Sequence, residues 1–394
     1  MTDKKTGIWF IGARGGVATT ATLGLLALEK GLIDHTGLVT GLPPLAGLNL
    51  VSWSDLVVGG HDIRRCSLFE TARTLAASHA VDATLVEKCS EGLAEINHRV
   101  RPGAIFHSGP AIDALAEYVM SCRTPREAIE RIKQDLTEFA AEHNLQRVVV
   151  VNVASTEPAT DIERLPETWD ELAKLLDTAD CPLRASSCYA IAAFELGMPL
   201  VNFTPSLGSA CPALEELALA HGVCHCGRDG KTGETLMKTV LAPMFAHRNL
   251  QVMSWVGHNI FGNLDGRVLD DPAHKASKVT SKDRVLSGIL GYDPQTLVSI
   301  EYIESMGDWK TAWDHIHFRG FLGTPMTMQF TWQGCDSLLA APLVLDLVRL
   351  VDCATRRGEK GTLPQLASFF KSPMGTTEHD FFRQFETLIE WAQE

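Results

Sequence analysis

The sequence lacks an apolar run long enough to cross a membrane. Its most apolar stretch, near residues 338–350, is interrupted by Pro342 and Asp346, whereas a spanning helix needs about 20 consecutive apolar residues. An excess of positive charge is also missing: the formal net charge is −13, which argues against a nucleic acid or an anionic membrane as partner. An anionic small molecule must therefore meet a local basic cluster.

Zinc-type cysteine spacing, a secretory signal, internal repeats and low-complexity segments are also missing. Among the ten cysteines, Cys181, Cys188, Cys224 and Cys226 match no standard zinc pattern. The first residues are polar and lead into an expected strand rather than a signal-type apolar segment. We therefore expect no bound metal at these positions, reduced and mostly buried thiols, and a cytoplasmic enzyme.

Lysine is scarce but clustered. Only 14 of the 35 basic residues are lysines, and six of these fall between Lys231 and Lys310. Two of them, Lys278 and Lys282, are four residues apart, so on a helix their ammonium groups share one face and repel unless an anion lies between them. Taken alone, this pair fits an exposed helix face better than a binding site.

The segment from Asp229 to Thr235 predicts a turn that leads into a helix, with Thr232 or Asp229 as N-cap and Gly233 just inside. Free backbone N–H groups at such a helix start suit a phosphate. Lysines and carboxylates dominate the region that follows, and candidate nucleophilic serines or cysteines are few. This composition indicates proton-transfer chemistry on a phosphorylated carbonyl compound.

The N-terminus has the layout of a dinucleotide-binding βαβ unit: an apolar strand at 7–11, a glycine loop, and an apolar helix at about 18–30. The loop spacing is G-x-x-G-G, with arginine where a glycine often stands. The residues predicted to contact the cofactor are Gly12, Arg14, Gly15, Gly16 and Val17. The alternative is a tight turn that only requires small residues.

Alternating strands and helices continue to about residue 234 and predict an α/β fold with a parallel sheet. An amphipathic helix at 125–144 begins with Thr124 as N-cap and precedes a buried strand at 147–153. That strand ends in the small and hydroxyl residues Ala154, Ser155 and Thr156, and open α/β sheets bind ligands at such ends.

The character of the chain changes after residue 234. Strand-like stretches at 252–256, 297–303, 313–319 and 326–332 follow a helix, and the last three are expected to form consecutive antiparallel neighbours. Helices are expected at 337–351, 363–371 and 378–393. We therefore predict a Rossmann-like domain of residues 1–234 and 337–394, with an inserted α+β catalytic and oligomerisation domain at 235–336.

Six segments together carry a resemblance to a known family. They are GRDGKTGET from Gly227, HNIFGNLDG from His258, SKVTSK from Ser277, MGDWK from Met306, DSLLAAPLVLDL from Asp336 and FFKSPM from Phe369. In order and spacing they resemble the myo-inositol-1-phosphate synthase family, whose members are also named inositol-3-phosphate synthases. The resemblance covers nearly the whole chain and is clearest from residue 186 onward.

The resemblance implies an isomerase that cyclises D-glucose 6-phosphate to 1D-myo-inositol 3-phosphate with a tightly held, recycled NAD. The implied steps are oxidation at C5, enolisation, aldol closure between C6 and C1, and reduction of the resulting ketone. It further implies that the C-terminal helices return to the first domain and that the inserted sheet builds a homotetramer. Whether ammonium or a divalent cation is required stays open.

The same resemblance assigns roles to individual residues. Lys278 acts as base at the C5 hydroxyl, Lys310 holds the C5 oxygen and Lys371 holds the C1 oxygen. Lys282 binds phosphate, and Asp229 orients a lysine or a sugar hydroxyl. The backbone of Thr232, Gly233, Glu234 and Thr235 cradles phosphate, while Asn259, Asn263 and Asp265 close over the substrate. Further cofactor contacts are Asp62, Ile63, Ala154, Ser155, Thr156, Asp308 and Asp336, of which Asp308 and Asp336 alternatively hold the lysines or a cation.

Simpler interpretations stay open for two carboxylates: Asp62 as N-cap of a helix at 68–75, and Asp336 as N-cap of the helix from Ser337.

The chain also departs from the family. Glu234 stands where an uncharged residue is usual, Leu264 replaces an asparagine, and Ser155 stands where asparagine is expected. A related substrate such as fructose 6-phosphate is the alternative within this chemistry. A dehydrogenase that releases NADH and a non-catalytic NAD sensor are the alternatives outside it.

Overall fold

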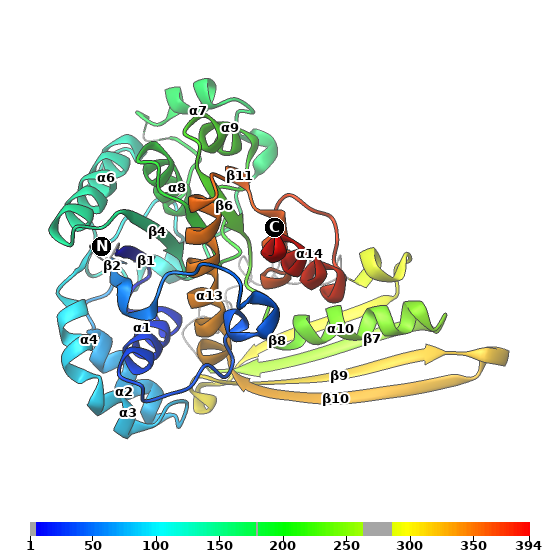
Figure 1. Ribbon diagram of the computed structural model, residues 1–394. Helices are drawn as coiled ribbons and strands as arrows, with labels where there is room; N and C mark the ends of the chain where they lie inside the picture. Colours follow the sequence, from blue (N-terminus) through cyan, green and yellow to red (C-terminus); the bar gives the residue numbers. More distant parts are fainter. Residues whose placement is uncertain (1–4, 179, 263–285) are drawn as a thin grey trace.

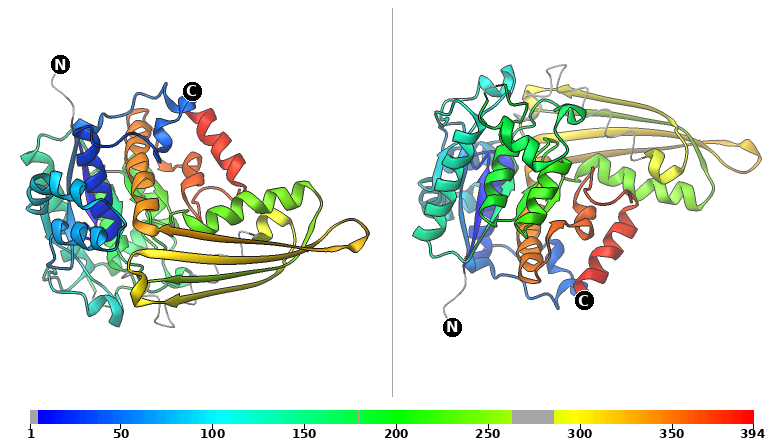
Figure 2. Two further views of the ribbon diagram at one scale, coloured as in Figure 1. Left: turned by 90° about the horizontal axis from the view of Figure 1, so that it is seen from below. Right: turned by 90° about the horizontal axis from the view of Figure 1, so that it is seen from above.

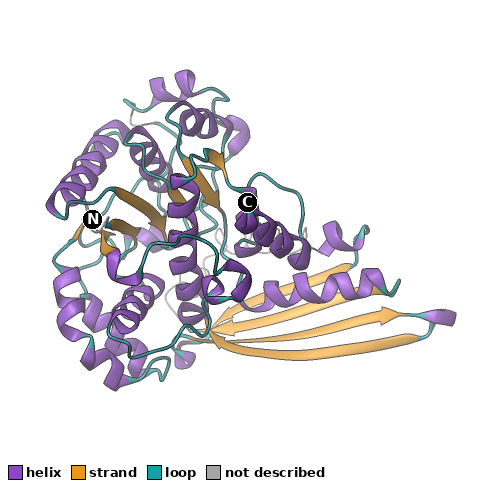
Figure 3. Ribbon diagram, viewed as in Figure 1, coloured by secondary structure: helices purple, strands orange, loops and turns teal. Residues whose placement is uncertain are grey.

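The computed structural model of the chain describes residues 5–178, 180–262 and 286–394. The predicted site residues Asn263, Asp265, Lys278 and Lys282, and the departure at Leu264, lie outside these residues. Two sheets organise the molecule, one enclosed by helices and one extending from it as a long arm (Figures 1 and 3). In the described residues, no helix is long and apolar enough to cross a membrane.

The larger sheet has seven strands, and all of its pairings are parallel. From one edge to the other, its strands are β11 (Gly361–Thr362), β6 (Cys224–Gly227), β5 (Leu200–Asn202), β4 (Arg147–Asn152), β1 (Thr6–Ile11), β2 (Leu56–Asp62) and β3 (Val100–Pro102). The central strands β1 and β4 are almost entirely buried, because helices cover both faces of the sheet. The parallel α/β prediction is confirmed.

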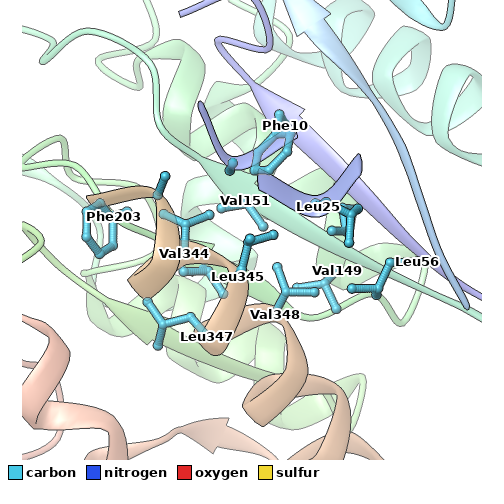
Figure 4. Packing of buried hydrophobic residues seen from close by; sticks show 14 of the residues in the cluster. Phe10, Leu25, Leu56, Val149, Val151, Phe203, Val344, Leu345, Leu347 and Val348 are labelled. Carbon is cyan, nitrogen blue, oxygen red and sulfur yellow. The ribbon is translucent and has the colours of Figure 1, made fainter. Parts of the chain in front are cut away.

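Two hydrophobic clusters lie on opposite faces of this sheet. One packs α1 (Gly16–Glu29) and α13 (Asp336–Arg356) against Phe10, Val149 and Val151, as Figure 4 shows. The other packs α6 (Pro125–Glu142), α8 (Ala185–Glu195) and α9 (Pro212–Ala220) against alternate residues of the same strands, including Trp9 and Val150. Thr124 caps α6 through its side chain, as predicted, with Pro125 at the first helical position.

Shorter helices complete the first domain around the end of β2 and after β4. They are α2 (Leu68–Ala77), α3 (Ala83–Lys88), α4 (Ser90–Asn97), α5 (Pro110–Asp113) and α7 (Trp169–Leu175).

The second sheet has the order β10-β9-β7-β8. Its strands are β7 (Gln251–Phe261), β8 (Gln295–Tyr302), β9 (Trp309–Arg319) and β10 (Pro325–Cys335), and α10 (Gly233–His247) packs on one face. The antiparallel pairing of β9 with β10 is as predicted. The prediction for β8 is wrong: β8 pairs in parallel with β7 and does not adjoin β9, because β9 crosses to the other side of β7.

The C-terminal part of the chain returns to the first domain (Figures 1 and 2). Helix α13 starts directly after β10 and packs beside α1, and β11 then extends the larger sheet. The segment predicted as a helix at 363–371 is a 3-10 helix, Pro364–Phe369, that ends before Lys371. Helix α14 (Phe381–Gln393) closes the chain against this 3-10 helix and α10.

Candidate active site

A cavity of about 460 Å³ lies at the carboxyl ends of β1, β2 and β4, where open α/β sheets bind ligands. Ten of the twelve residues predicted to bind the cofactor line it: Gly12, Gly15, Gly16, Val17, Asp62, Ile63, Ala154, Ser155, Asp308 and Asp336. The two exceptions are Arg14 and Thr156. The Arg14 side chain donates to Asn97 Oδ1 and to the Arg64 carbonyl, and Thr156 lines a neighbouring cavity of about 180 Å³ together with Asp229.

Close backbone approach requires small residues in the glycine loop. Gly12 has φ +83°, and a Cβ at this position would lie 2.7 Å from the Cα of Ala154. On the neighbouring strand β2, a Cβ on Gly60 would lie 2.3 Å from the carbonyl oxygen of Phe10, so β2 also approaches β1 closely. The loop therefore does more than turn the chain: it presents bare backbone to a cavity of dinucleotide-binding type. These residues fit an NAD molecule.

Asp62 ends β2 at the bottom of this cavity. Its Oδ2 accepts a hydrogen bond from the backbone N–H of Arg14 at 2.7 Å, and its Oδ1 accepts one from the N–H of Arg64 at 2.8 Å. The interpretation of Asp62 as a helix N-cap is wrong, because Ser67 caps α2 through a complete capping box with Glu70. Asp62 thus links the glycine loop to the end of β2.

A second group of side chains joins the two sheets at the mouth of the cavity. Asp308 accepts hydrogen bonds from Cys335 Sγ at 2.5 Å and from Ser337 Oγ at 3.2 Å, and burial raises the pKa of its carboxyl. Asp336 forms an ion pair with Lys310 at 3.8 Å. The N-cap interpretation of Asp336 is wrong, because Cys335 occupies that position and no side chain caps the helix.

Lys371 and Asp229 meet although 142 residues separate them. Their backbones pair, since Lys371 N–H donates to the Asp229 carbonyl at 2.6 Å and the N–H groups of Arg228 and Ser372 donate to each other's carbonyls. Their side chains form an ion pair at 2.9 Å, with 9% of the Asp229 side chain and 19% of the Lys371 side chain exposed.

The charge state of Lys371 follows from two opposing effects. Burial lowers the pKa of the ammonium, but the Asp229 carboxylate outweighs this and raises the pKa above its usual value, with Asp336 and Glu234 adding to the rise. Lys371 therefore stays protonated at neutral pH and suits the stabilisation of an oxyanion rather than the removal of a proton. Asp336 lines the first cavity and Asp229 the neighbouring one, and Glu157 and Ser206 line both, so the two ion pairs border adjoining cavities.

A sequence model of an NAD-binding family described as myo-inositol-1-phosphate synthase matches residues 6–393. The chain belongs to this family.

Curated relatives and solved structures agree with the family assignment. The chain is 35% identical to inositol-3-phosphate synthase 1 of Bacteroides thetaiotaomicron, over 98% of this chain and 94% of that protein. It is 28% identical to inositol-3-phosphate synthase 1 of Oryza sativa, over 90% of this chain and 76% of that protein. The crystal structure of inositol-3-phosphate synthase from Caenorhabditis elegans superposes with a TM-score of 0.90 at 26% identity, covering 99% of this chain and 86% of that one. A myo-inositol-1-phosphate synthase-related protein from Thermotoga maritima superposes with a TM-score of 0.79 at 26% identity, covering 99% and 98%.

The carboxylate of Glu234 is the departure from the family pattern that the structure explains. Its side chain forms an ion pair with Lys238 at 2.7 Å, and only 1% of each side chain is exposed. A Cβ added to Gly257 of β7 would lie 2.5 Å from Glu234 Oε1, so the carboxylate packs against the second sheet. Lys238 balances the charge of the carboxylate there. The first backbone N–H groups of α10, at residues 233–235, have no partner within the helix.

Not every lysine of the cluster enters the site. Lys231 is 3% exposed and donates to Gln384 Oε1 of α14 at 2.5 Å, and burial lowers its pKa to about 7. Lys231 and Lys238 therefore bind other side chains of the protein, Gln384 and Glu234, and stabilise the loop 229–235. Asn259 is fully buried on β7, and its Oδ1 has no hydrogen-bond partner in the part of the chain that the structure describes.

Several residues that line the cofactor cavity were not predicted from the sequence. They are Arg64, Cys66, Thr71, Ser108, Glu157, Ser186 and Tyr189, among others. Glu157 follows directly on the predicted segment 154–156 and lines both cavities; it accepts hydrogen bonds from Ser186. The signal for Arg64 was its place two residues after Asp62 at the end of β2, where dinucleotide-binding folds contact the adenosine ribose.

Proposed function

We propose that this protein is an NAD-dependent inositol-3-phosphate synthase that cyclises D-glucose 6-phosphate to 1D-myo-inositol 3-phosphate. The observation that carries the proposal is that the Asp229–Lys371 and Lys310–Asp336 ion pairs border adjoining cavities, one of them of dinucleotide-binding type. The reaction forms oxyanions at two carbons of one sugar, and two separately held ammonium groups match that requirement.

Gly12, Gly15, Gly16 and Asp62 would hold NAD in the cavity, and the bound dinucleotide would supply reversible hydride transfer at C5 of the sugar, so that the overall reaction is an isomerisation. The protein's part begins with the proton of the C5 hydroxyl, which Lys278 removes. Lys310 then donates to the C5 oxygen and stabilises the enolate that forms when a C6 proton leaves. Its partner Asp336 fixes the ammonium at this position.

Ring closure forms the C6–C1 bond and moves negative charge to the C1 oxygen. Lys371, which Asp229 keeps protonated, donates to this oxygen. The backbone at 232–235 and Lys282 hold the phosphate, and Asn263 and Asp265 close over the sugar, whereas Asn259 is buried on β7 and takes no part in this closure. Binding both ends of an open-chain sugar brings C6 and C1 together, which lowers the entropic cost of an intramolecular reaction.

The wider features of the proposal follow the family. Residues 1–234 and 337–394 form the cofactor domain, and 235–336 form the inserted domain that associates into a homotetramer. Exposed apolar side chains on the inserted sheet, Trp313 and Leu297, support an association surface there. The location is cytoplasmic, and ammonium or a divalent cation near Asp308 and Asp336 completes the site.

The test is phosphorus and proton NMR of purified protein with glucose 6-phosphate and NAD only at the concentration of the enzyme. We expect inositol phosphate to accumulate over many turnovers, and Lys278→Ala to abolish it. Accumulation of NADH with one oxidised sugar per NAD would instead identify a dehydrogenase. Conversion of fructose 6-phosphate but not glucose 6-phosphate would move the assignment to a related cyclase.

A further inference from the structure

Two side chains of the described residues, Glu157 and Ser206, line both the dinucleotide-type cavity and the cavity beside it. Glu157 lies on the loop after β4, and Ser206 lies on the loop after β5. The backbone N–H of Glu157 donates to Ser206 Oγ at 3.0 Å, which joins the two loops where the cavities meet. Of these two groups the carboxylate is much the stronger base, so Glu157 is the candidate proton acceptor at this border.

The proposed reaction requires a proton acceptor at this border. C5 of the sugar must face the nicotinamide in the first cavity. The C1 oxygen must reach Lys371, whose ion-pair partner Asp229 lines the second cavity. Because C6 is bonded to C5 and attacks C1, it lies between these two ends. The proton that C6 loses on enolisation therefore leaves close to where the two cavities adjoin.

The carboxylate of Glu157 is held in place but keeps lone pairs for a further donor. Its Oε1 accepts a hydrogen bond from the backbone N–H of Ser186 at 3.0 Å, and its Oε2 accepts one from the Ser186 hydroxyl. An ionised carboxylate has about four lone-pair sites, so both oxygens can still accept a proton. Burial raises the pKa of the Glu157 carboxyl, although the hydrogen bonds from Ser186 oppose the rise. A higher pKa makes the ionised carboxylate a stronger base.

The other carboxylates that line one of the two cavities, within the described part of the chain, have different partners. Asp229 and Asp336 each form an ion pair with a lysine that the proposed reaction uses at an oxyanion. Asp308 accepts hydrogen bonds from Cys335 and Ser337 and lines only the first cavity. Asp62 and Glu70 accept backbone hydrogen bonds at the glycine loop and at the start of α2. Glu157 alone among these carboxylates lines both cavities.

We propose that Glu157 is the general base that removes the C6 proton. The C6–H bond breaks, its electron pair forms the C5–C6 double bond of the enolate, and the C5 oxygen takes the negative charge beside Lys310. On ring closure C6 bonds to C1, and the C1 oxygen takes a proton from Lys371. The proton on Glu157 then returns to Lys371 across the second cavity, so both groups are restored. This inference rests on the proposed function, because it supplies one step of that reaction.

The test compares Glu157→Gln and Glu157→Asp with the unmodified protein, using glucose 6-phosphate with hydrogen or deuterium at C6 and NAD at the concentration of the enzyme. In Glu157→Gln we expect kcat for inositol phosphate, followed by NMR, to fall by about 10²–10⁴, the usual contribution of a general base. Oxidation at C5 precedes the blocked step, so NADH should accumulate on the enzyme and be visible by absorbance.

Glu157→Asp keeps a carboxylate but withdraws it from C6. Turnover should therefore recover in part, and deuterium at C6 should slow kcat more than it does in the unmodified protein. Glu163→Gln is the matched control, because Glu163 is exposed and lines neither cavity.

The outcomes separate this inference from the proposed function. Slow turnover with accumulated NADH in Glu157→Gln supports the base. Unchanged turnover overturns it and assigns the C6 proton to another base, such as the phosphate of the substrate, while the proposed function stands. Slow turnover without NADH also overturns it, because Glu157 then only positions the cofactor or its loop. If Glu157→Gln does not fold, an isotope effect in Glu157→Asp equal to that of the unmodified protein overturns it. Absence of both NADH and inositol phosphate in the unmodified protein overturns the proposed function as well.

Discussion

Asp229→Asn tests whether the ion pair with Lys371 sets the charge of the lysine. The substitution keeps an oxygen that accepts a hydrogen bond but removes the charge located 2.9 Å from Nζ. In the unmodified protein the carboxylate outweighs the effect of burial. Without it burial dominates, so we expect the pKa of Lys371 to fall below that of a free lysine.

The magnitude follows from the exposure of the pair. Removing one partner of a buried ion pair costs about 3–5 kcal/mol. Because the amide still accepts a hydrogen bond and 19% of the Lys371 side chain is exposed, we expect the free energy of unfolding to fall by about 2 kcal/mol at neutral pH. Urea denaturation gives this number, and Asp293→Asn, at an exposed position, is the control.

The pH dependence has a definite sign. A lysine with a raised folded-state pKa contributes stability that is complete below its unfolded pKa of about 10.4 and is lost as the pH rises through the folded value. In the Asp229→Asn variant the folded-state pKa of Lys371 is lowered. The variant's loss of unfolding free energy, relative to the unmodified protein, is therefore complete at neutral pH and becomes smaller toward pH 10. The alkaline limb of kcat should also move to lower pH. An unmoved limb together with an unfolding free energy within 0.5 kcal/mol of the unmodified protein would refute the reasoning.

Other substitutions test the remaining parts of the site. Lys310→Met should lower kcat by about 10²–10³, with a smaller change in KM, since it removes an oxyanion donor; steady-state kinetics measures both. Gly12→Ala should weaken NAD binding at least tenfold by titration, because its Cβ would lie 2.7 Å from Ala154 Cα and its φ is +83°; unchanged affinity would contradict the close approach. Lys238→Met should destabilise the fold by about 3–5 kcal/mol because it removes the ammonium paired with the buried Glu234 carboxylate. A second substitution, Glu234→Leu, should restore most of the loss in thermal unfolding; no recovery would show that the pair is not the cause.

Local patterns predicted much of the first domain. Continuous apolar strands, a glycine loop and capped helices each carry their signal within a few residues, and these elements appear where expected. The partner of β8 was predicted wrongly because alternation along a strand reveals its buried face but not its neighbour in the sheet. The segment 363–371 is apolar enough for a helix but forms only a 3-10 turn before it pairs with residues 228–230.

Local sequence patterns reveal even less about which residues meet in the site. No pattern within the sequence joins Asp229 to Lys371, and only the family resemblance suggested that they share a site. The clustering of lysines along the sequence predicted more basic residues in the site than the structure places there, because Lys231 binds Gln384 and Lys238 binds Glu234. Arg64 escaped notice because an arginine after a strand resembles an ordinary solvated residue until the cavity beside it is known.

The joint between β10 and α13 has a mechanical consequence. Strand and helix follow each other without a connecting residue, and Asp308 hydrogen-bonds to one side chain on each side of the junction. Because no residue separates them, a rotation of the arm would be transmitted directly to α13, whose first residues line the cavity. With strands of eleven residues, the arm is about 36 Å long, so a small rotation at the junction would displace Phe321, between β9 and β10, by several ångströms. A distance probe at Phe321 would therefore report a rearrangement at the cavity from the far end of the molecule.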